Sequence, residues 1–217
     1  MTTFIRTHVH QHMDRVNTRT VLAVPGVREM LNGEAPIDAA FYRRFIRSFR
    51  QQRDRSRDVV KPWVAGVASG ESVPRLDARV YRLSAEESAG VERFSSRLER
   101  GYEYFMLEHD GPLSTLVRAY YIESLALTFV PALNARLLGI AAPKAETTDR
   151  LDRLWQAVRG FITSEEDVAR IEKEIQAHAA LFSAFLMELS LELYSEDPAE
   201  ETGVAASVAV GAMAAAS

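Results

Sequence analysis

Three histidines near the start of the chain are the first residues that could do chemistry. His8, His10 and His12 alternate in the sequence. On a helix, positions 8 and 12 share a face and position 10 points away, so a regular helix cannot direct all three at one metal ion. One of His8, His10 and His12, with His12 preferred, could be the axial ligand of a haem or a ligand of iron. The competing interpretation is that these histidines are exposed and have no function.

A single acid, Glu123, stands in the most apolar long run of the chain, residues 113–139. A carboxylate on a helix that is apolar on nearly all sides must be hydrogen-bonded, paired, protonated or bound to a metal ion. Two interpretations stay open. Glu123 is either a structural partner of an arginine or a tyrosine hydroxyl, or a catalytic or metal-binding group in a cavity between helices.

A second acid belongs to the last apolar stripe of the sequence. His178 takes an apolar position in that stripe, and Glu174 precedes it by four residues. Residues with this spacing are neighbours on a helix face. A buried histidine that is satisfied by a neighbour is one interpretation. The other is that His178 and Glu174 are metal ligands, or that His178 donates a proton inside the bundle.

Arginines are concentrated between positions 43 and 57, where seven of them occur with the single acid Asp54. The simplest interpretation is the solvated face of a helix. The alternative is a site for anionic groups such as propionates, phosphates or carboxylates, with Arg43 and Arg47 among its ligands. A nucleic-acid partner is not expected, because the formal net charge is −4 and no nucleic-acid-binding motif accompanies the arginines.

The elements that must position these residues all carry helical signals. Pro112 suits a helix start and Gly139 a helix end, and Pro131 predicts a kink over residues 127–130. Ser84 with Glu87, and Thr163 with Glu166, have the spacing of capping boxes. A helix end is predicted at Gly33, and Lys61-Pro62 is predicted to interrupt or end the next helix. The predicted helices cover residues 3–24, 27–32, 38–61, 84–109, 113–139 and 149–162, followed by a last helix that ends before Pro198.

The length and composition predict one all-α domain. The chain has 217 residues, of which 47% are hydrophobic and 26% charged, which suits a single-domain bundle of about six to seven helices over residues 1–197. Residues 198–217, rich in Ala, Val and Ser, are predicted to be a disordered tail. The absence of cysteine excludes disulfides and a cysteine nucleophile. The first residues lack an apolar signal core, which predicts a cytoplasmic protein. Glu123 and Pro131 favour a core helix over a membrane span for residues 113–139.

Three stretches of the sequence resemble the heme-oxygenase-like superfamily. They are MLNGEAPIDAAFYRRFIRSF at 30–49, YYIES at 120–124 and HAALFSAFLMEL at 178–189. The superfamily holds the heme oxygenases and, on the same fold, the thiaminase II, pyrroloquinoline-quinone synthase and di-iron oxidase families. The resemblance implies a helical bundle with a histidine ligand in its first helix, to which His12 is nearest. The chain departs from heme oxygenases at residues 124–129, where it has no glycine.

Three functions are compatible with these patterns. The first is a haem-binding, oxygenase-type oxidoreductase. One of His8, His10 and His12, with His12 preferred, would be its axial ligand, Glu123 its catalytic group, and Arg43, Arg47 and Tyr120 would lie at the cofactor. The second is a non-haem iron oxidase or oxygenase that uses Glu123, Glu174 and His178. The third is a non-catalytic helical binding or interaction protein, for which a homodimer stays open. The partner expected in the first two cases is a small-molecule substrate, which the sequence does not identify.

Overall fold

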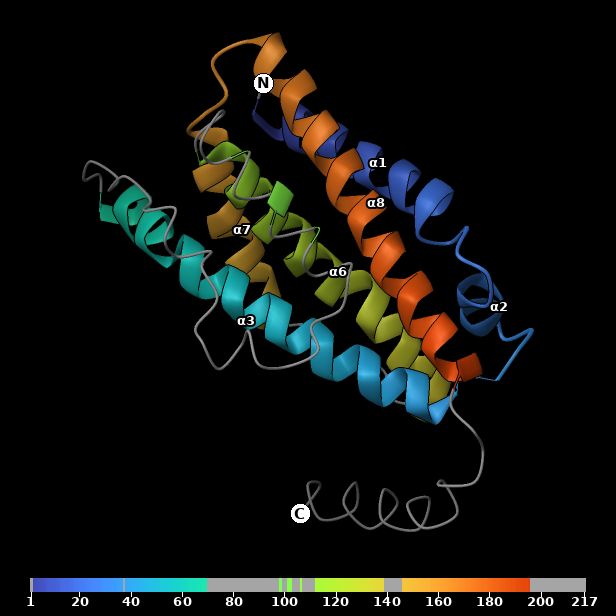
Figure 1. Cartoon of the computed structure of the whole chain (residues 1–217). Helices are drawn as coiled ribbons and strands as arrows, with labels where there is room; N and C mark the ends of the chain where they lie inside the picture. The colour runs from blue at the N-terminus through green and yellow to red at the C-terminus, as the bar shows by residue number, and fades with distance from the viewer. Residues whose placement is uncertain are drawn as a thin grey trace.

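The computed structural model of the chain is built of α-helices (Figure 1). It describes residues 2–36, 38–69, 98, 101, 102, 106, 112–138 and 146–195. Over these residues the regular secondary structure is helical and contains no strand, so the predicted all-α bundle is confirmed. The helices are α1 (Thr2–Thr20), α2 (Val27–Asn32), α3 (Ala39–Ser69), α6 (Leu113–Leu138), α7 (Glu146–Arg159) and α8 (Glu165–Ser195).

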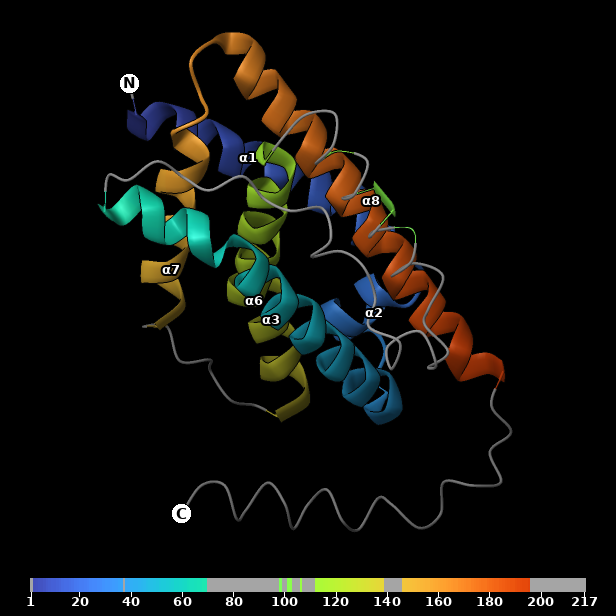
Figure 2. The ribbon, with the colours of Figure 1, turned by 60° about the vertical axis from the view of Figure 1, so that its left-hand side comes forward.

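The apolar helix α6 lies at the centre of the bundle. It packs against α2, α3, α7 and α8, and α1 runs beside α8 (Figures 1 and 2). Every residue from 113 to 125 is buried, which is the position that its nearly uniform apolar sequence predicts. In the described part of the chain, one helix is long and apolar enough to cross a membrane, over Leu113–Arg136. Since 67% of its apolar window is buried inside the bundle, a core helix explains this composition as well.

Phenylalanines join α3 to α6 and α8. Phe41, Phe45 and Phe49 recur at steps of four along α3, and all three are buried. The ring of Phe45 lies 5.4 Å from that of Phe49 and 5.6 Å from that of Phe129 on α6. It lies 6.3 Å from Phe182 on α8. Aromatic pairs at such distances contribute about 0.5–1.5 kcal/mol each beyond the burial of their area.

One predicted helix end, at Gly33, is confirmed, and the predicted end before Pro25-Gly26 lies a few residues too late. Gly33 follows α2 with φ +80° and donates its backbone N–H to the last turn, as predicted. The first helix ends at Thr20 rather than at residue 24, and residues 21–26 form turns that close with Gly26 at φ +82°. A positive φ is readily available to glycine because it has no Cβ.

The predicted interruption or end of the helix at Lys61-Pro62 is wrong. Helix α3 continues through Pro62 to Ser69. Proline removes one backbone hydrogen bond, yet the buried side chains of Val59, Val60 and Trp63 flank it on the core side. The free energy gained by burying these side chains offsets the lost hydrogen bond. Sequence rules count the cost of the proline but do not include this packing. Helix α6 likewise continues through Pro131, and the kink there stays a prediction.

The start of α8 is fixed by a capping box one residue later than predicted. Ser164 donates its backbone N–H to Asp167 Oδ2 at 2.8 Å, and Asp167 N–H donates to Ser164 Oγ at 3.3 Å. Thr163 also donates its backbone N–H to the same carboxylate at 2.7 Å. Hydrogen bonds from Thr163 and Ser164 lower the pKa of Asp167 to about 2. The box is therefore Ser164 with Asp167 rather than Thr163 with Glu166.

Other predictions differ by a few residues or lie outside the described residues. Helix α7 begins at Glu146, inside the predicted loop, and ends at Arg159 rather than at residue 162. Of the helix predicted over 84–109, the described residues Leu98, Gly101, Tyr102 and Met106 are helical, and the remainder lies outside the described part. The tail predicted over 198–217 lies outside it as well.

Candidate functional site

A pocket of 740 Å³ lies between the first turns of α1, the end of α7 and the start of α8. This volume is within the range of about 300–1,000 Å³ that is typical of small-molecule sites. Four polar side chains that can carry charge line it, namely His8, Arg159, Glu165 and Glu172. The apolar part of its wall comes from Phe4, Ile5, Trp155, Ile162, Val168 and Ala169. It combines apolar walls with a few polar groups, as ligand pockets do.

Two of the predicted histidine ligands, His8 and His12, face one acid on α8. The Nε2 atom of His8 lies 2.8 Å from Glu172 Oε1, and Nδ1 of His12 lies 3.3 Å from the same oxygen. Gln176 lies 3.5 Å from the other ring nitrogen of His12. Positions 8 and 12 thus share a face, as their spacing predicts. They differ in one respect, since His8 lines the pocket and His12 is not among its lining residues.

The third histidine, His10, points away from this pair, as predicted, and its Nε2 is hydrogen-bonded to the hydroxyl of Tyr120. Burial raises the pKa of Tyr120 to about 12, and burial together with Arg6 lowers the pKa of His10. Near neutral pH a neutral tyrosine therefore faces a neutral histidine. The ring of Tyr120 also lies 5.5 Å from Trp155, so this predicted cofactor residue packs behind one wall of the pocket.

Glu123 is held by arginines. Its side chain is 2% exposed, and it accepts hydrogen bonds from Arg53 at 2.8 and 3.0 Å and from Arg57 at 2.5 and 3.3 Å. Arg150 of α7 approaches Oε1 at 3.5 Å. Burial by itself would raise the pKa of Glu123, but the hydrogen bonds from Arg57 and Arg53 bring the pKa below its ordinary value. Of the two interpretations of Glu123, this geometry agrees with the one in which an ionised carboxylate is the structural partner of arginines.

A separate buried cluster contains Glu174 and His178. Glu174 accepts hydrogen bonds from Ser114 at 2.6 Å and from Tyr102 at 3.1 Å. His178 Nε2 lies 3.7 Å from Glu174, which is too long for a hydrogen bond. Neither ring nitrogen of His178 has a partner in good hydrogen-bond geometry within the described ranges, and a contact with the backbone of Ser114 is the smallest influence on its pKa. Burial, and secondly the charge of Arg118, lower the pKa of His178 to about 3, so this imidazole is neutral at pH 7.

The predicted iron ligands are divided between two places. Glu174 and His178 lie together, whereas Glu123 belongs to the arginine cluster. Ser114, which binds Glu174, is nine positions from Glu123 on α6, and nine residues turn an α-helix by about 180° to its opposite face. Among the residues that the structure describes, no group of three or more His, Asp or Glu side chains could hold a metal ion.

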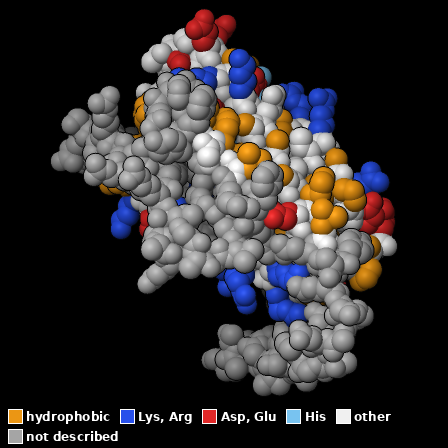
Figure 3. All heavy atoms as spheres, viewed as in Figure 1, with side chains coloured by type: hydrophobic (Ala, Val, Ile, Leu, Met, Phe, Trp, Pro, Cys, Tyr) orange, Lys and Arg blue, Asp and Glu red, His pale blue; other side chains and the backbone are white. Residues whose placement is uncertain are grey.

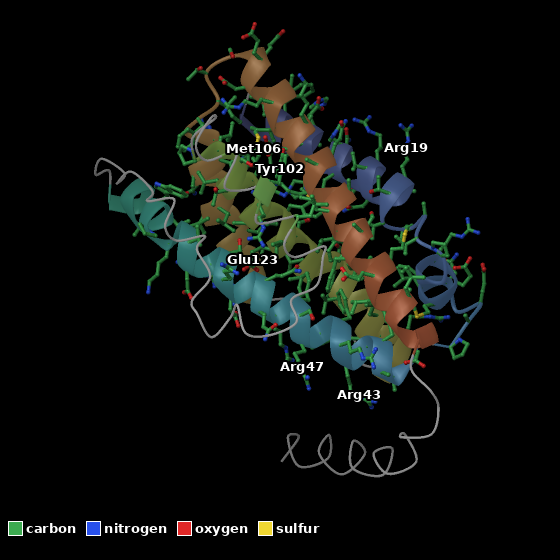
Figure 4. All side chains as sticks on the ribbon, in the orientation of Figure 1. Arg19, Arg43, Arg47, Tyr102, Met106 and Glu123 are labelled. Carbon is green, nitrogen blue, oxygen red and sulfur yellow. The ribbon has the colours of Figure 1, made fainter. Side chains whose placement is uncertain are left out.

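The predicted haem-binding residues are likewise not brought together. Arg43 and Arg47 are exposed and extend from α3 away from the bundle (Figure 4). On the face drawn in Figure 3, basic side chains gather along the lower edge of the bundle. His12 instead faces α8 and Tyr120 faces α1. Of the predicted residues, His8 is the one that lines the described pocket.

Several residues of these sites were missed at the sequence level. Arg53 and Arg57 were part of the arginine run but were not singled out, although a signal for them exists. The buried phenylalanines of α3 recur at steps of four, and the same row continues from Phe49 to Arg53 and Arg57. Arg150, Arg159 and Glu172 lie on helix faces with no comparable pattern.

Comparison with known proteins gives no match, neither with a protein-family model nor with a curated protein nor with a solved structure. The heme-oxygenase-like assignment therefore depends on the three sequence stretches at 30–49, 120–124 and 178–189. Statements about function depend on the geometry of the described sites.

Proposed function

We propose that the protein is a small-molecule-binding helical bundle whose pocket between α1, α7 and α8 takes an apolar ligand with an acidic group. The pocket of 740 Å³ carries this proposal. Its walls are largely apolar, and Arg159 is the arginine in its lining, which also contains Glu165 and Glu172. Within the described residues, Arg159 has no acidic partner, so it is available to a carboxylate of the ligand.

Haem is the member of this ligand class that we propose to test first. Haem fits the pocket because its apolar macrocycle suits the walls and its propionates suit Arg159. The imidazole of His8 can act as a ligand of its iron. His8 Nε2 is engaged by Glu172 at 2.8 Å, so a bond from His8 to iron would replace that contact. Bound haem would supply iron redox chemistry, and the protein would then be an oxygenase-type oxidoreductase, as the family resemblance implies.

Titration of the protein with haem should shift the Soret band, and His8→Ala should weaken haem binding at least tenfold. The reason is that His8 is the pocket histidine. His12→Ala is the matched control, because His12 lies on the same helix and contacts the same acid but does not line the pocket. We expect its dissociation constant to stay within about threefold of the original. The measurement is absorbance spectroscopy at fixed protein concentration.

Two results would overturn the haem form of the proposal. One is an unchanged Soret band in the original protein, and the other is an equal loss of binding in the two histidine variants. The wider ligand class has its own test with dansyl-undecanoate, a fluorescent apolar carboxylate. Its binding should be weakened at least fivefold by Arg159→Gln, and equal binding by the variant and the original protein would contradict the proposed pocket.

A further inference from the structure

The arginines around Glu123 carry more positive charge than the acid can neutralise. Arg53, Arg57 and Arg150 share this one buried carboxylate. The other acid in contact with them is Asp54, which is 71% exposed and lies 3.7 Å from Arg57. Within the described part of the chain, at least one guanidinium charge is left without a close acidic partner.

Within the described residues, most N–H donors of this cluster make no hydrogen bond. Each guanidinium has five N–H donors in a planar fork. The cluster donates four hydrogen bonds to Glu123, two from Arg53 and two from Arg57. Arg150 donates no hydrogen bond within the described residues and stays 3.5 Å from the carboxylate. The carboxylate thus occupies one side of the cluster and leaves further donors on the other.

Solvent reaches the cluster, and an ion could follow. The exposed fractions of the side chains are 24% for Arg53, 26% for Arg57 and 38% for Arg150, whereas Glu123 is 2% exposed. Figure 4 shows Glu123 in the middle of the bundle, at the crossing of α3 with α6 and α7. The acid therefore holds the arginines from the inside, and their outer parts face water.

Mutual repulsion makes this arrangement costly without an anion. Burial is the largest cause that lowers the pKa of Arg150. The charge of Arg57 lowers it further, the charge of Glu123 raises it, and the charges of Arg53 and Arg153 lower it again, so that the pKa is lowered on balance. A bound anion on the solvent side would convert this repulsion into attraction. A carboxylate would add one negative charge. A phosphate group would add about two and offers several oxygens in a tetrahedral array, which suits three separate guanidinium forks.

We propose that Arg53, Arg57 and Arg150 form a binding site for a phosphate group, either inorganic phosphate or a phosphate monoester. The site lies at the junction of α3, α6 and α7, apart from the pocket lined by His8. It is therefore independent of the haem proposal. A protein with both sites would take an apolar ligand at one position and a phosphate group at the other.

Isothermal titration calorimetry tests the site with inorganic phosphate, glycerol 3-phosphate and acetate at constant ionic strength. Arg150→Gln should weaken phosphate binding at least tenfold, because it removes the guanidinium that no hydrogen bond occupies. Arg19→Gln is the control, since Arg19 is exposed near the end of α1, away from the junction of α3, α6 and α7 (Figure 4). We expect its affinity to stay within threefold.

The outcomes separate the sources of the phosphate group. Tighter binding of glycerol 3-phosphate than of inorganic phosphate assigns the site to a monoester, and the reverse assigns it to the free ion. Absence of binding, equal binding by the original protein and Arg150→Gln, or acetate binding as tightly as phosphate would each overturn the proposal. Arg150→Lys keeps the charge without the fork and should give an intermediate affinity, and circular dichroism checks that each variant is folded.

Discussion

Glu123→Gln should lower the free energy of unfolding by about 3 kcal/mol. Removal of one partner from a buried ion pair typically costs about 3–5 kcal/mol, and the partial exposure of the arginines places the expected value at the lower end. Glutamine keeps the shape of the side chain, so the loss is one of charge rather than of packing. Arg53 and Arg57 would then face an amide that cannot accept both forks as an anion does.

Urea denaturation followed by circular dichroism measures this change. Glu166→Gln is the control, because Glu166 is an exposed glutamate in the first turn of α8 and its loss should change the free energy of unfolding by less than about 0.5 kcal/mol. A double-mutant cycle with Arg57→Gln should show coupling, since the two residues are in direct contact. A loss below 1 kcal/mol for Glu123→Gln would contradict the prediction. It would mean that water stabilises the arginine charges as well as the carboxylate does.

The same residue predicts how acid affects the fold. The pKa of Glu123 is lower in the folded protein than its ordinary value of 4.5, because the arginine hydrogen bonds outweigh the effect of burial. A carboxyl with a lowered folded-state pKa stabilises the fold fully above its unfolded-state pKa, and this contribution is lost as the pH falls through the folded-state pKa. Glu123→Gln should therefore flatten the decline of stability below pH 4.5.

How much of the fold and of the sites could be predicted depends on how far apart in the sequence the contacting residues are. The burial of Glu123 followed from the apolar run around it, and the proximity of Glu174 to His178 followed from their spacing on one helix. The partners of Glu123 did not follow. They come from α3 and α7, and their choice among many arginines depends on how α3 crosses α6. Helical periodicity contains no information on that crossing.

The pocket was beyond the sequence for a related reason. It is formed by the ends of three helices, and its wall depends on where α7 stops. The apolar stripe predicted that α7 continues to Ile162, whereas the helix ends at Arg159 and the next residues turn towards α8. This turn places Ile162 and Thr163 in the wall beside His8. The sequence does not show that α7 ends at Arg159, and therefore does not show that His8, rather than His12, lines the pocket.

A buried histidine provides the second large effect. Below pH 6.5, His178 should make the original protein progressively less stable than His178→Leu. The pKa of His178 is about 3 in the folded protein, chiefly because the ring is fully buried, against 6.5 when unfolded. Between these values the unfolded chain binds a proton that the folded chain does not. Stability is therefore complete above pH 6.5 and declines as the pH falls towards 3.

The size of the effect follows from the number of pH units. One unit corresponds to about 1.4 kcal/mol, so at pH 4.5 His178 should cost the original protein about 3 kcal/mol relative to its stability at pH 7. Arg118, Glu174, Tyr102 and Ser114 surround the ring and remain in the variant, so the difference between the two profiles isolates the histidine. At pH 7, His178→Leu should be as stable as the original protein or more stable, because the imidazole nitrogens have no partner in good hydrogen-bond geometry within the described ranges.

Urea denaturation of both proteins at pH 7, 5.5 and 4.5 measures the two profiles. Parallel profiles would mean that His178 takes up its proton equally in the folded and unfolded states, which requires water or an acid to reach the ring. A large loss of stability for His178→Leu at pH 7 would instead show that the imidazole holds a partner through one of its nitrogens. The predicted divergence requires a dry, neutral ring, packed 5.7 Å from Tyr102 and beside a carboxylate that is already held by two hydroxyl groups.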